Sequence, residues 1–316
     1  MAFIRYEEAP VWVGFGAAGI KLLATNVTVS ENMPLTPVRS VGYNGAIAVM
    51  PSGPPEGSFS ISYNINIGSR DSSACGADTT TTYGSFTDFW QSEDAAGAIN
   101  NNFVLRRGYN SSSNLYLGVG HDSVLFNQGF ATSFSISAEP NAVVTPTLNG
   151  SFFDCGILTD TILQDVADDG EGELSLLHGS KTTMEADARA AIGFNCSPFS
   201  ANYEASRGTN PVYSLGSLEA RFVQVTDPQE SITLQGENLP AGIIGSDCNP
   251  CTAMTSAAFT VNALCNDSGA GAGKYSVCGP VQSRDIEVAV DDVLRGNITV
   301  VDYTFKQALP ALPACS

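Results

Sequence analysis

Side chains that could carry catalysis are few in this chain and lie far apart. The two histidines stand in different contexts, His121 among glycines and His178 after two leucines. A serine nucleophile on a strand-to-helix turn needs the pattern Gly-x-Ser-x-Gly, and no serine of the sequence has it. We expect His121 in a turn and His178 at the border of a packed segment. The sequence therefore predicts no catalytic residue and a protein that is not an enzyme.

Two stretches match ligand-binding motifs only in part. Residues 14–19 have the glycine spacing of a dinucleotide-binding loop, but the strand and helix that should flank it are missing. Residues 165–176 are acidic like a calcium loop, yet Ala167 and Leu176 occupy positions that need oxygen ligands. We predict a flexible arm at the first stretch, a solvated acidic loop at the second, and no bound cofactor.

The spacing of the cysteines leaves three interpretations open. Cys248 and Cys251 form a close pair, but a structural zinc site needs a second close pair or nearby histidines. Disulfides would follow if the protein ends up outside a cell, and reduced thiols would follow in a cytosolic product. We favour reduced thiols and predict no metal site. The cysteines are Cys75, Cys155, Cys196, Cys248, Cys251, Cys265, Cys278 and Cys315.

The composition excludes several classes of protein. Of 316 residues, 43% are hydrophobic and only 15% are charged, unlike a disordered chain or a long charged helix. The 14 Lys and Arg against 32 Asp and Glu give a net charge of −18, so the chain repels phosphate backbones. Residues 1–8 lack the basic start and apolar run of a signal peptide, and glycines interrupt the apolar stretch at 11–23. We expect no sequence-specific nucleic-acid binding, no export signal and no membrane anchor.

Alternation of apolar and polar residues is the main structural signal. Residues 58–67 alternate without a fault, with aromatic and aliphatic side chains at the odd positions, as in a strand with one buried face. Shorter versions occur at 133–137, 230–235 and 286–290, with turns rich in Gly and Pro between them. The pattern predicts a mainly β protein made of antiparallel β-sandwich or barrel domains.

Two segments have helical character. Residues 181–192 are rich in good helix formers and are followed by Gly193, a residue common after a last helical turn. Residues 85–91 give a weaker signal. We expect about one helix beside each β-domain.

The second half of the chain repeats features of the first. The pattern Pro-Val-x-Ser-x-Gly occurs twice, and a turn-rich stretch and an alternating strand follow each copy. Each half then contains a strand, a short acidic turn and a strand, at 133–152 and 285–305. Shared order favours a duplicated domain, although β-proteins in general reuse such turns. The repeated turn residues are Pro37, Val38, Ser40, Gly42, Pro211, Val212, Ser214 and Gly216.

These features divide the chain into four predicted segments. They are an N-terminal arm at 1–19, a first β-domain at 20–153, a connecting segment with a helix at 154–200, and a second β-domain at 201–316. The second β-domain contains a Cys-rich insertion at 247–279.

Several stretches resemble phage tail tube proteins. Residues 202–207 with the turn after them, and residues 25–32 with theirs, are similar to the opening strands of that family. Residues 135–145 resemble the closing strand pair. The Cys-rich segment does not match the family pattern, so the resemblance does not decide which tail component the chain would be. The resemblance implies two tube-type domains per chain, a ring of three chains that mimics a ring of six, and stacked rings that conduct DNA.

The resemblance also implies partners and a location. The partners would be further copies of the chain and the terminator, tape measure and distal tail proteins, in a virion tail assembled in the host cytoplasm. DNA would pass an acidic lumen without specific binding, because Lys or Arg would hold it. The alternatives are a β-sandwich adhesin or receptor- or carbohydrate-binding virion protein, and a tail hub or neck ring component. Candidate lumen acids are Glu139, Glu287, Asp291 and Asp292.

Overall fold

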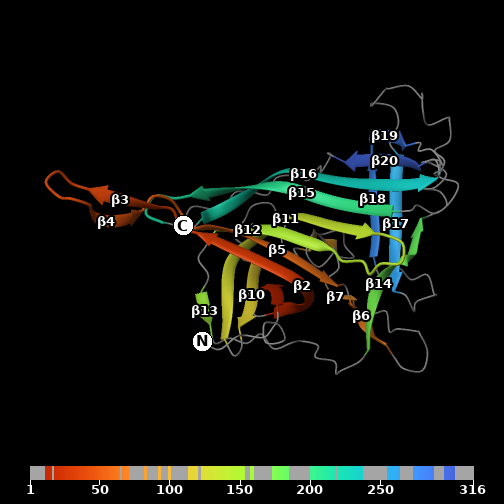
Figure 1. The fold of residues 1–316 in the computed structure, drawn as a ribbon, viewed down its shortest axis with the longest axis horizontal. Helices are drawn as coiled ribbons and strands as arrows, with labels where there is room; N and C mark the ends of the chain where they lie inside the picture. Colours follow the sequence, from red (N-terminus) through yellow and green to blue (C-terminus); the bar gives the residue numbers. More distant parts are fainter. Residues whose placement is uncertain are drawn as a thin grey trace.

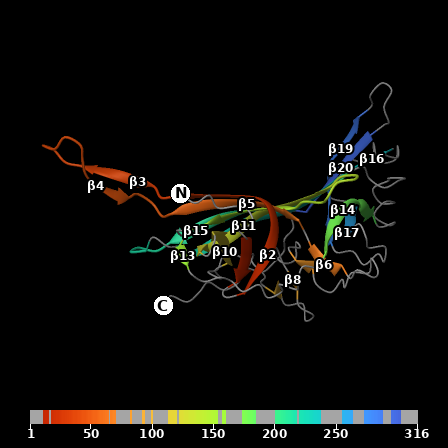
Figure 2. The ribbon, with the colours of Figure 1, turned by 60° about the horizontal axis from the view of Figure 1, so that its bottom comes forward.

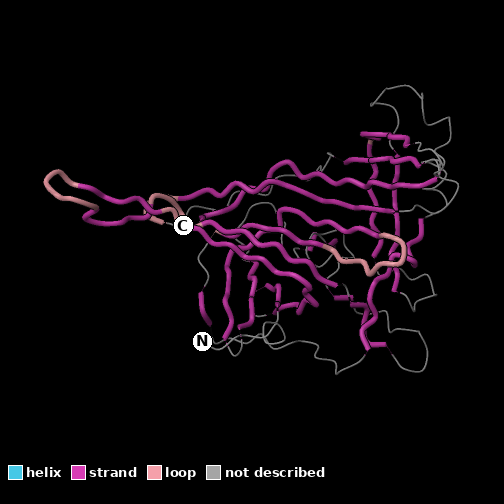
Figure 3. Tube along the Cα trace, in the orientation of Figure 1, coloured by secondary structure: helices cyan, strands magenta, loops and turns pink. Residues whose placement is uncertain are grey.

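In the computed structural model the described residues form antiparallel β-sheets. Every regular element among them is a strand (Figure 3), which confirms the predicted mainly β class. No helix that could span a membrane occurs in this part of the chain. The described residues are 11–15, 18–64, 66–70, 82–83, 92–93, 99–100, 113–119, 122–153, 157–159, 173–184, 200–217, 220–237, 255–263, 273–287 and 295–302.

One 11-stranded sheet contains strands from both halves of the chain (Figure 1). Its order is β10-β1-β2-β5-β12-β11-β15-β16-β20-β19, with β13 beside β11. The two halves meet where β11 pairs with β15, so they share one continuous sheet. The strands are β1 (Val11–Phe15), β2 (Ala18–Asn32), β5 (Glu56–Asn64), β10 (Ser113–Val119), β11 (Asp122–Ala138), β12 (Thr147–Phe152), β13 (Ile157–Thr159), β15 (Ser200–Tyr213), β16 (Ala220–Glu237), β19 (Val281–Glu287) and β20 (Arg295–Asp302).

A five-stranded sheet packs on one face of the large sheet, at the end where β16, β19 and β20 lie (Figures 1 and 2). Its strands β14, β17 and β18 run across the strands of the large sheet (Figure 1). Two small hairpins complete the described part. The five strands are β6 (Asn66–Arg70), β7 (Thr82–Tyr83), β14 (Glu173–Met184), β17 (Thr255–Ala263) and β18 (Gly273–Gly279), and the hairpins pair β3 (Leu35–Arg39) with β4 (Ala46–Pro51) and β8 (Ser92–Glu93) with β9 (Ile99–Asn100).

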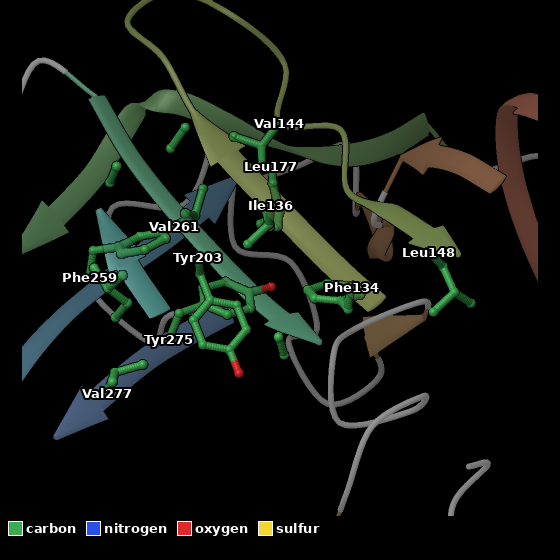
Figure 4. Close-up of a cluster of buried hydrophobic side chains, with 14 of the residues drawn as sticks. Phe134, Ile136, Val144, Leu148, Leu177, Tyr203, Phe259, Val261, Tyr275 and Val277 are labelled. Atoms are coloured by element: carbon green, nitrogen blue, oxygen red, sulfur yellow. The ribbon is translucent and has the colours of Figure 1, made fainter. Parts of the chain in front are cut away.

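The main hydrophobic core lies between the two sheets (Figure 4). Tyr203 of the large sheet and Phe259 of the small one both contact the ring of Tyr275, with centroids 5.3 and 5.4 Å apart. Phe134 stacks on the same tyrosine at 6.4 Å. These rings come from segments far apart in sequence, so burying them ties the two sheets together.

The alternation at residues 58–67 is confirmed over its first part. Phe59, Ile61 and Tyr63 are 3%, 0% and 0% exposed, whereas the residues between them lie on the other face of β5. The strand ends at Asn64, and the chain enters the five-stranded sheet as β6, so the predicted single strand is shorter than expected. Residue 65 and the side chain of Ile67 lie outside the described residues.

The predicted helix at 181–192 is wrong at its start. Lys181, Thr182, Thr183 and Met184 belong to β14, which pairs with β17. Two β-branched threonines suit a ladder of this kind, and the tertiary pairing outweighs the helix preference of the neighbours. Residues 185–192 and the weaker helical segment at 85–91 lie outside the described residues.

Two further segments differ from their expected form. The predicted flexible arm instead contains β1, which pairs with β2 and places Gly14 opposite Gly19. The glycine spacing at 14–19 is compatible with such a hairpin. Within the Cys-rich segment, β17 and β18 form a hairpin whose Phe259 and Tyr275 are in the core. That segment therefore contributes to the folded body. Apart from Cys278 in β18, its cysteines lie outside the described residues.

Candidate assembly surfaces

The two repeated turns share one backbone design. The hydrogen bonds are Tyr43 N to Ser40 O and Ser217 N to Ser214 O, each 3.3 Å. Gly42 and Gly216 have φ angles of 92° and 88°, which a type II turn requires at its third residue. Val41 and Leu215, just before the glycines, are fully exposed. Each turn therefore presents one apolar side chain to its surroundings.

The likeness extends into the strands before the turns. Pro37 and Val38 lie in β3, and Pro211 and Val212 lie in β15. The β3–β4 ladder shifts register directly after Val38, and the β15–β16 ladder shifts directly after Val212. An irregularity at the same place in both copies shows that the sequence repeat is also a backbone repeat.

The β3–β4 hairpin projects away from the sheets (Figures 1 and 2). It carries many exposed apolar side chains. We call residues 33–51 the apolar arm. Concentrated apolar exposure of this kind usually marks a surface that another molecule covers. The exposed side chains are Met33, Leu35, Val41, Tyr43, Ile47, Val49 and Met50.

The large sheet contains the same strand order twice. Strands β2, β5, β12 and β11 lie in that order in one half, and β15, β16, β20 and β19 do so in the other. In the ladders, Leu148 lies between Ile61 and Phe134, while Ile298 lies between Leu234 and Arg284. The register shifts in matching places, between Ala131 and Ser133 on β11 and between Val281 and Ser283 on β19. We call these four-stranded groups the two repeat units.

The repeat units meet in one seam and leave two strand edges. Within the chain, β11 of the first unit pairs with β15 of the second over residues 133–138 and 201–206. At the far ends, β19 and residues 26–32 of β2 each have a partner strand on one side alone among the described residues. Such edges are templates for pairing with another strand.

The face of the large sheet opposite the core is covered with uncharged polar side chains. We call it the polar face. Its central strands carry Glu204 as an exposed charge, and Glu56, Asp285 and Arg295 are exposed charges toward its margins. Hydroxyl and amide groups bond across strands, for example Asn149 Nδ2 to Ser133 Oγ at 2.9 Å. The residues of the polar face are Asn26, Thr28, Ser30, Ser58, Ser60, Ser62, Asn64, Ser133, Ser135, Ser137, Thr147, Asn149, Ser151, Ser200, Asn202, Ser206, Ser231, Thr233, Gln235, Asn297 and Thr299.

Of the four predicted lumen acids, two lie in the described part of the chain. Glu139 is exposed in the turn between β11 and β12, and Glu287 is the last residue of β19. Asp291 and Asp292 lie outside the described residues. The alternation at 58–67 predicted polar side chains on the outer face of β5, but not a polar face that continues across the neighbouring strands. The Ser, Thr and Asn residues between the buried positions of each strand were the available signal.

A carboxyl pair is present in the second repeat unit and absent from the first. Glu230 lies opposite Asp302, and Tyr203 hydrogen-bonds to Glu230. Burial raises the pKa of Glu230 to about 7, and the charge of Asp302 adds to this, whereas the bond from Tyr203 opposes it. Burial and the neighbouring Glu230 raise the pKa of Tyr203. In the first unit the matching positions hold Gly57 and Phe152, an apolar pair.

No catalytic or metal-binding arrangement is found among the described residues. His178 lies on β14 beside buried Leu177, and its Nδ1 is 2.8 Å from Ser180 Oγ. The described residues contain no group of three or more metal-ligating side chains. His121 and the acidic stretch at 165–172 lie outside the described residues. No protein-family model matches the chain, and the search of curated proteins found no match.

Proposed function

We propose that the chain is a bacteriophage tail tube subunit. Each chain supplies two tandem tube-type β-domains, three chains close into a ring, and stacked rings form the conduit for DNA ejection. One observation carries the proposal: the two repeat units have the same strand order and are joined by the β11–β15 seam. A seam between like units can be repeated from chain to chain until the ring closes.

Two surfaces support this role. The apolar arm suits contact between successive rings, because stacking would remove its exposed side chains from water. The polar face suits the lumen, because its many hydroxyl and amide groups offer DNA phosphates no fixed cation and outnumber the exposed Arg295. In this proposal the protein has no enzymatic activity and needs no cofactor.

The proposal fixes partners and place. Further copies of the chain are the main partner, and the terminator, tape measure and distal tail proteins contact the two ends of the tube. Genomic DNA passes without specific binding. Assembly takes place in the host cytoplasm, and the finished tube resides in the virion tail.

Negative-stain microscopy and mass measurement of the purified chain test the proposal. We expect rings that contain three chains with six similar lobes, and stacks of these rings at higher concentration. Rings that never stack would favour a hub or neck component. A discrete monomer or trimer that binds glycans would overturn the proposal in favour of an adhesin.

A further inference from the structure

We propose that β19 of one chain pairs with β2 of a second copy in a register set by the internal β11–β15 seam. This inference rests on the proposed ring. It places Arg284 opposite Glu31 and Ile286 opposite Val29 of the neighbouring copy. The interaction surface is therefore the pair of strand edges at the outer ends of the two repeat units.

The register follows from matching each edge strand to its counterpart. Strand β19 corresponds to β11, because Arg284 and Phe134 occupy the same place in their ladders and the same register shift precedes both. Strand β2 corresponds to β15 through their partner strands β5 and β16, in which Phe59 and Ile232 are counterparts. Val29 lies opposite Phe59, and Tyr203 lies opposite Ile232. The spacing of Val29 and Tyr203 equals that of Gly42 and Gly216 in the repeated turns, 174 residues.

The internal seam then gives the external one. Within the chain, Phe134 lies opposite Ala205 and Ile136 lies opposite Tyr203. Replacing each residue by its counterpart gives the pairs Arg284 with Glu31 and Ile286 with Val29. Two further pairs follow in the same way, Asp285 with Ser30 and Ser283 with Asn32.

The chemistry of the predicted pairs is complementary. Arg284 and Glu31 are exposed and of opposite charge, and opposite charges directly across two strands attract. Ile286 is an exposed apolar side chain, 43% accessible, that the neighbouring strand would cover. In the internal seam, the apolar pair Phe134 and Ala205 occupies the place of Arg284 and Glu31. A charge on an edge strand discourages pairing with the wrong edge before assembly, since two copies of β2 would bring carboxylates together.

Charge reversal tests the pair. Arg284→Glu alone and Glu31→Arg alone should each raise the concentration needed for ring formation roughly tenfold, because attraction becomes repulsion. The double variant should return it close to the wild-type value. Glu139→Arg, which reverses an exposed carboxylate outside both strands, is the matched control and should have little effect. Failure of the double variant to recover would overturn the register.

Cysteine cross-linking tests the register independently. Directly opposed residues have Cα atoms about 4.5–5.5 Å apart, which a disulfide can bridge. Oxidation should therefore link a Ser30→Cys chain to an Asp285→Cys chain, and should not link Ser30→Cys to Ser283→Cys, which lies one diagonal away. The wild type, with its own cysteines, controls for background. Rings without the first cross-link would overturn the register and leave the tube proposal standing. Absence of any ring would overturn both.

Discussion

Individual side chains of β5 have sharply different environments although they alternate along one strand. Ile61 is fully buried in the main core, and Ser60 lies on the polar face. Ile61→Ala should lower the free energy of unfolding by roughly 2–5 kcal/mol, because it removes buried surface and leaves a cavity. Ser60→Ala should change it by less than about 1 kcal/mol. Urea denaturation of both variants measures the difference. Equal losses would mean that both faces of β5 are buried.

Glu230 should make stability depend on pH in the neutral range. Its pKa in the folded protein is about 7, above the ordinary value of 4.5, so the folded state holds the proton more tightly. This contribution is fully present below pH 4.5 and is lost as the pH rises through 7. Relative to Glu230→Gln, the wild type should lose up to about 3 kcal/mol between these limits.

Urea denaturation of the two proteins from pH 4 to pH 8 checks this expectation. The Gln variant keeps the shape of the side chain but does not titrate, so it serves as the reference at each pH. Stability curves that run parallel for the two proteins would show that Glu230 does not titrate in the expected way.

At the scale of elements, the apolar arm should be separable from the folded body. Ser52 N donates a 2.9 Å hydrogen bond to Pro34 O at its base. Replacing residues 35–51 by Asn-Gly gives a two-residue turn that can keep this bond. We expect the variant to fold with nearly unchanged stability and to form rings that do not stack.

Microscopy and light scattering compare this variant with the wild type at matched concentrations. Val41→Ser, which changes the exposed tip alone, should weaken stacking to a smaller extent. Normal stacks formed by the shortened chain would remove the arm from the contact between rings.

Local patterns predicted some elements because the pattern and the packing agree. In β5, Phe59, Ile61 and Tyr63 alternate with polar residues, and one face is buried as expected. At Lys181 and Thr182 the local helix preference failed, because β17 offers a ladder that sequence windows do not contain. The pairing partners of a strand are set by residues far along the chain.

The same reasoning explains which parts of the candidate surfaces were predictable. The turns at Gly42 and Gly216 need positive φ angles, so their residue types are visible in the sequence. The polar face depends on strand order, because Ser60 and Thr233 share a face only once the intervening ladders are known. Likewise, β2 and β19 can be identified as edge strands only when the strand order of the sheet is known.

At the scale of the whole molecule, the polar face should be sensitive to positive charge. Ser60→Lys combined with Ser135→Lys adds cations to it, and DNA should then bind the assembled protein at low salt. Binding should fall as salt rises, with a slope of about −0.9 per phosphate contact. The matched control is Ser180→Lys with Thr183→Lys on β14, outside the polar face. Equal DNA binding by both variants would argue against a lumen at the polar face.

The internal β11–β15 seam has a consequence for the kinetics of assembly. Folding of a single chain closes this seam, so it forms at a rate that does not depend on protein concentration. In the proposed ring, half of the seams form in this way, and only those between chains require collisions. Each molecule that joins an assembly loses translational and rotational freedom, and a ring of three loses it for fewer particles than a ring of six separate units. The concentration dependence of nucleation should therefore approach third order rather than sixth, which favours ring formation at low subunit concentration.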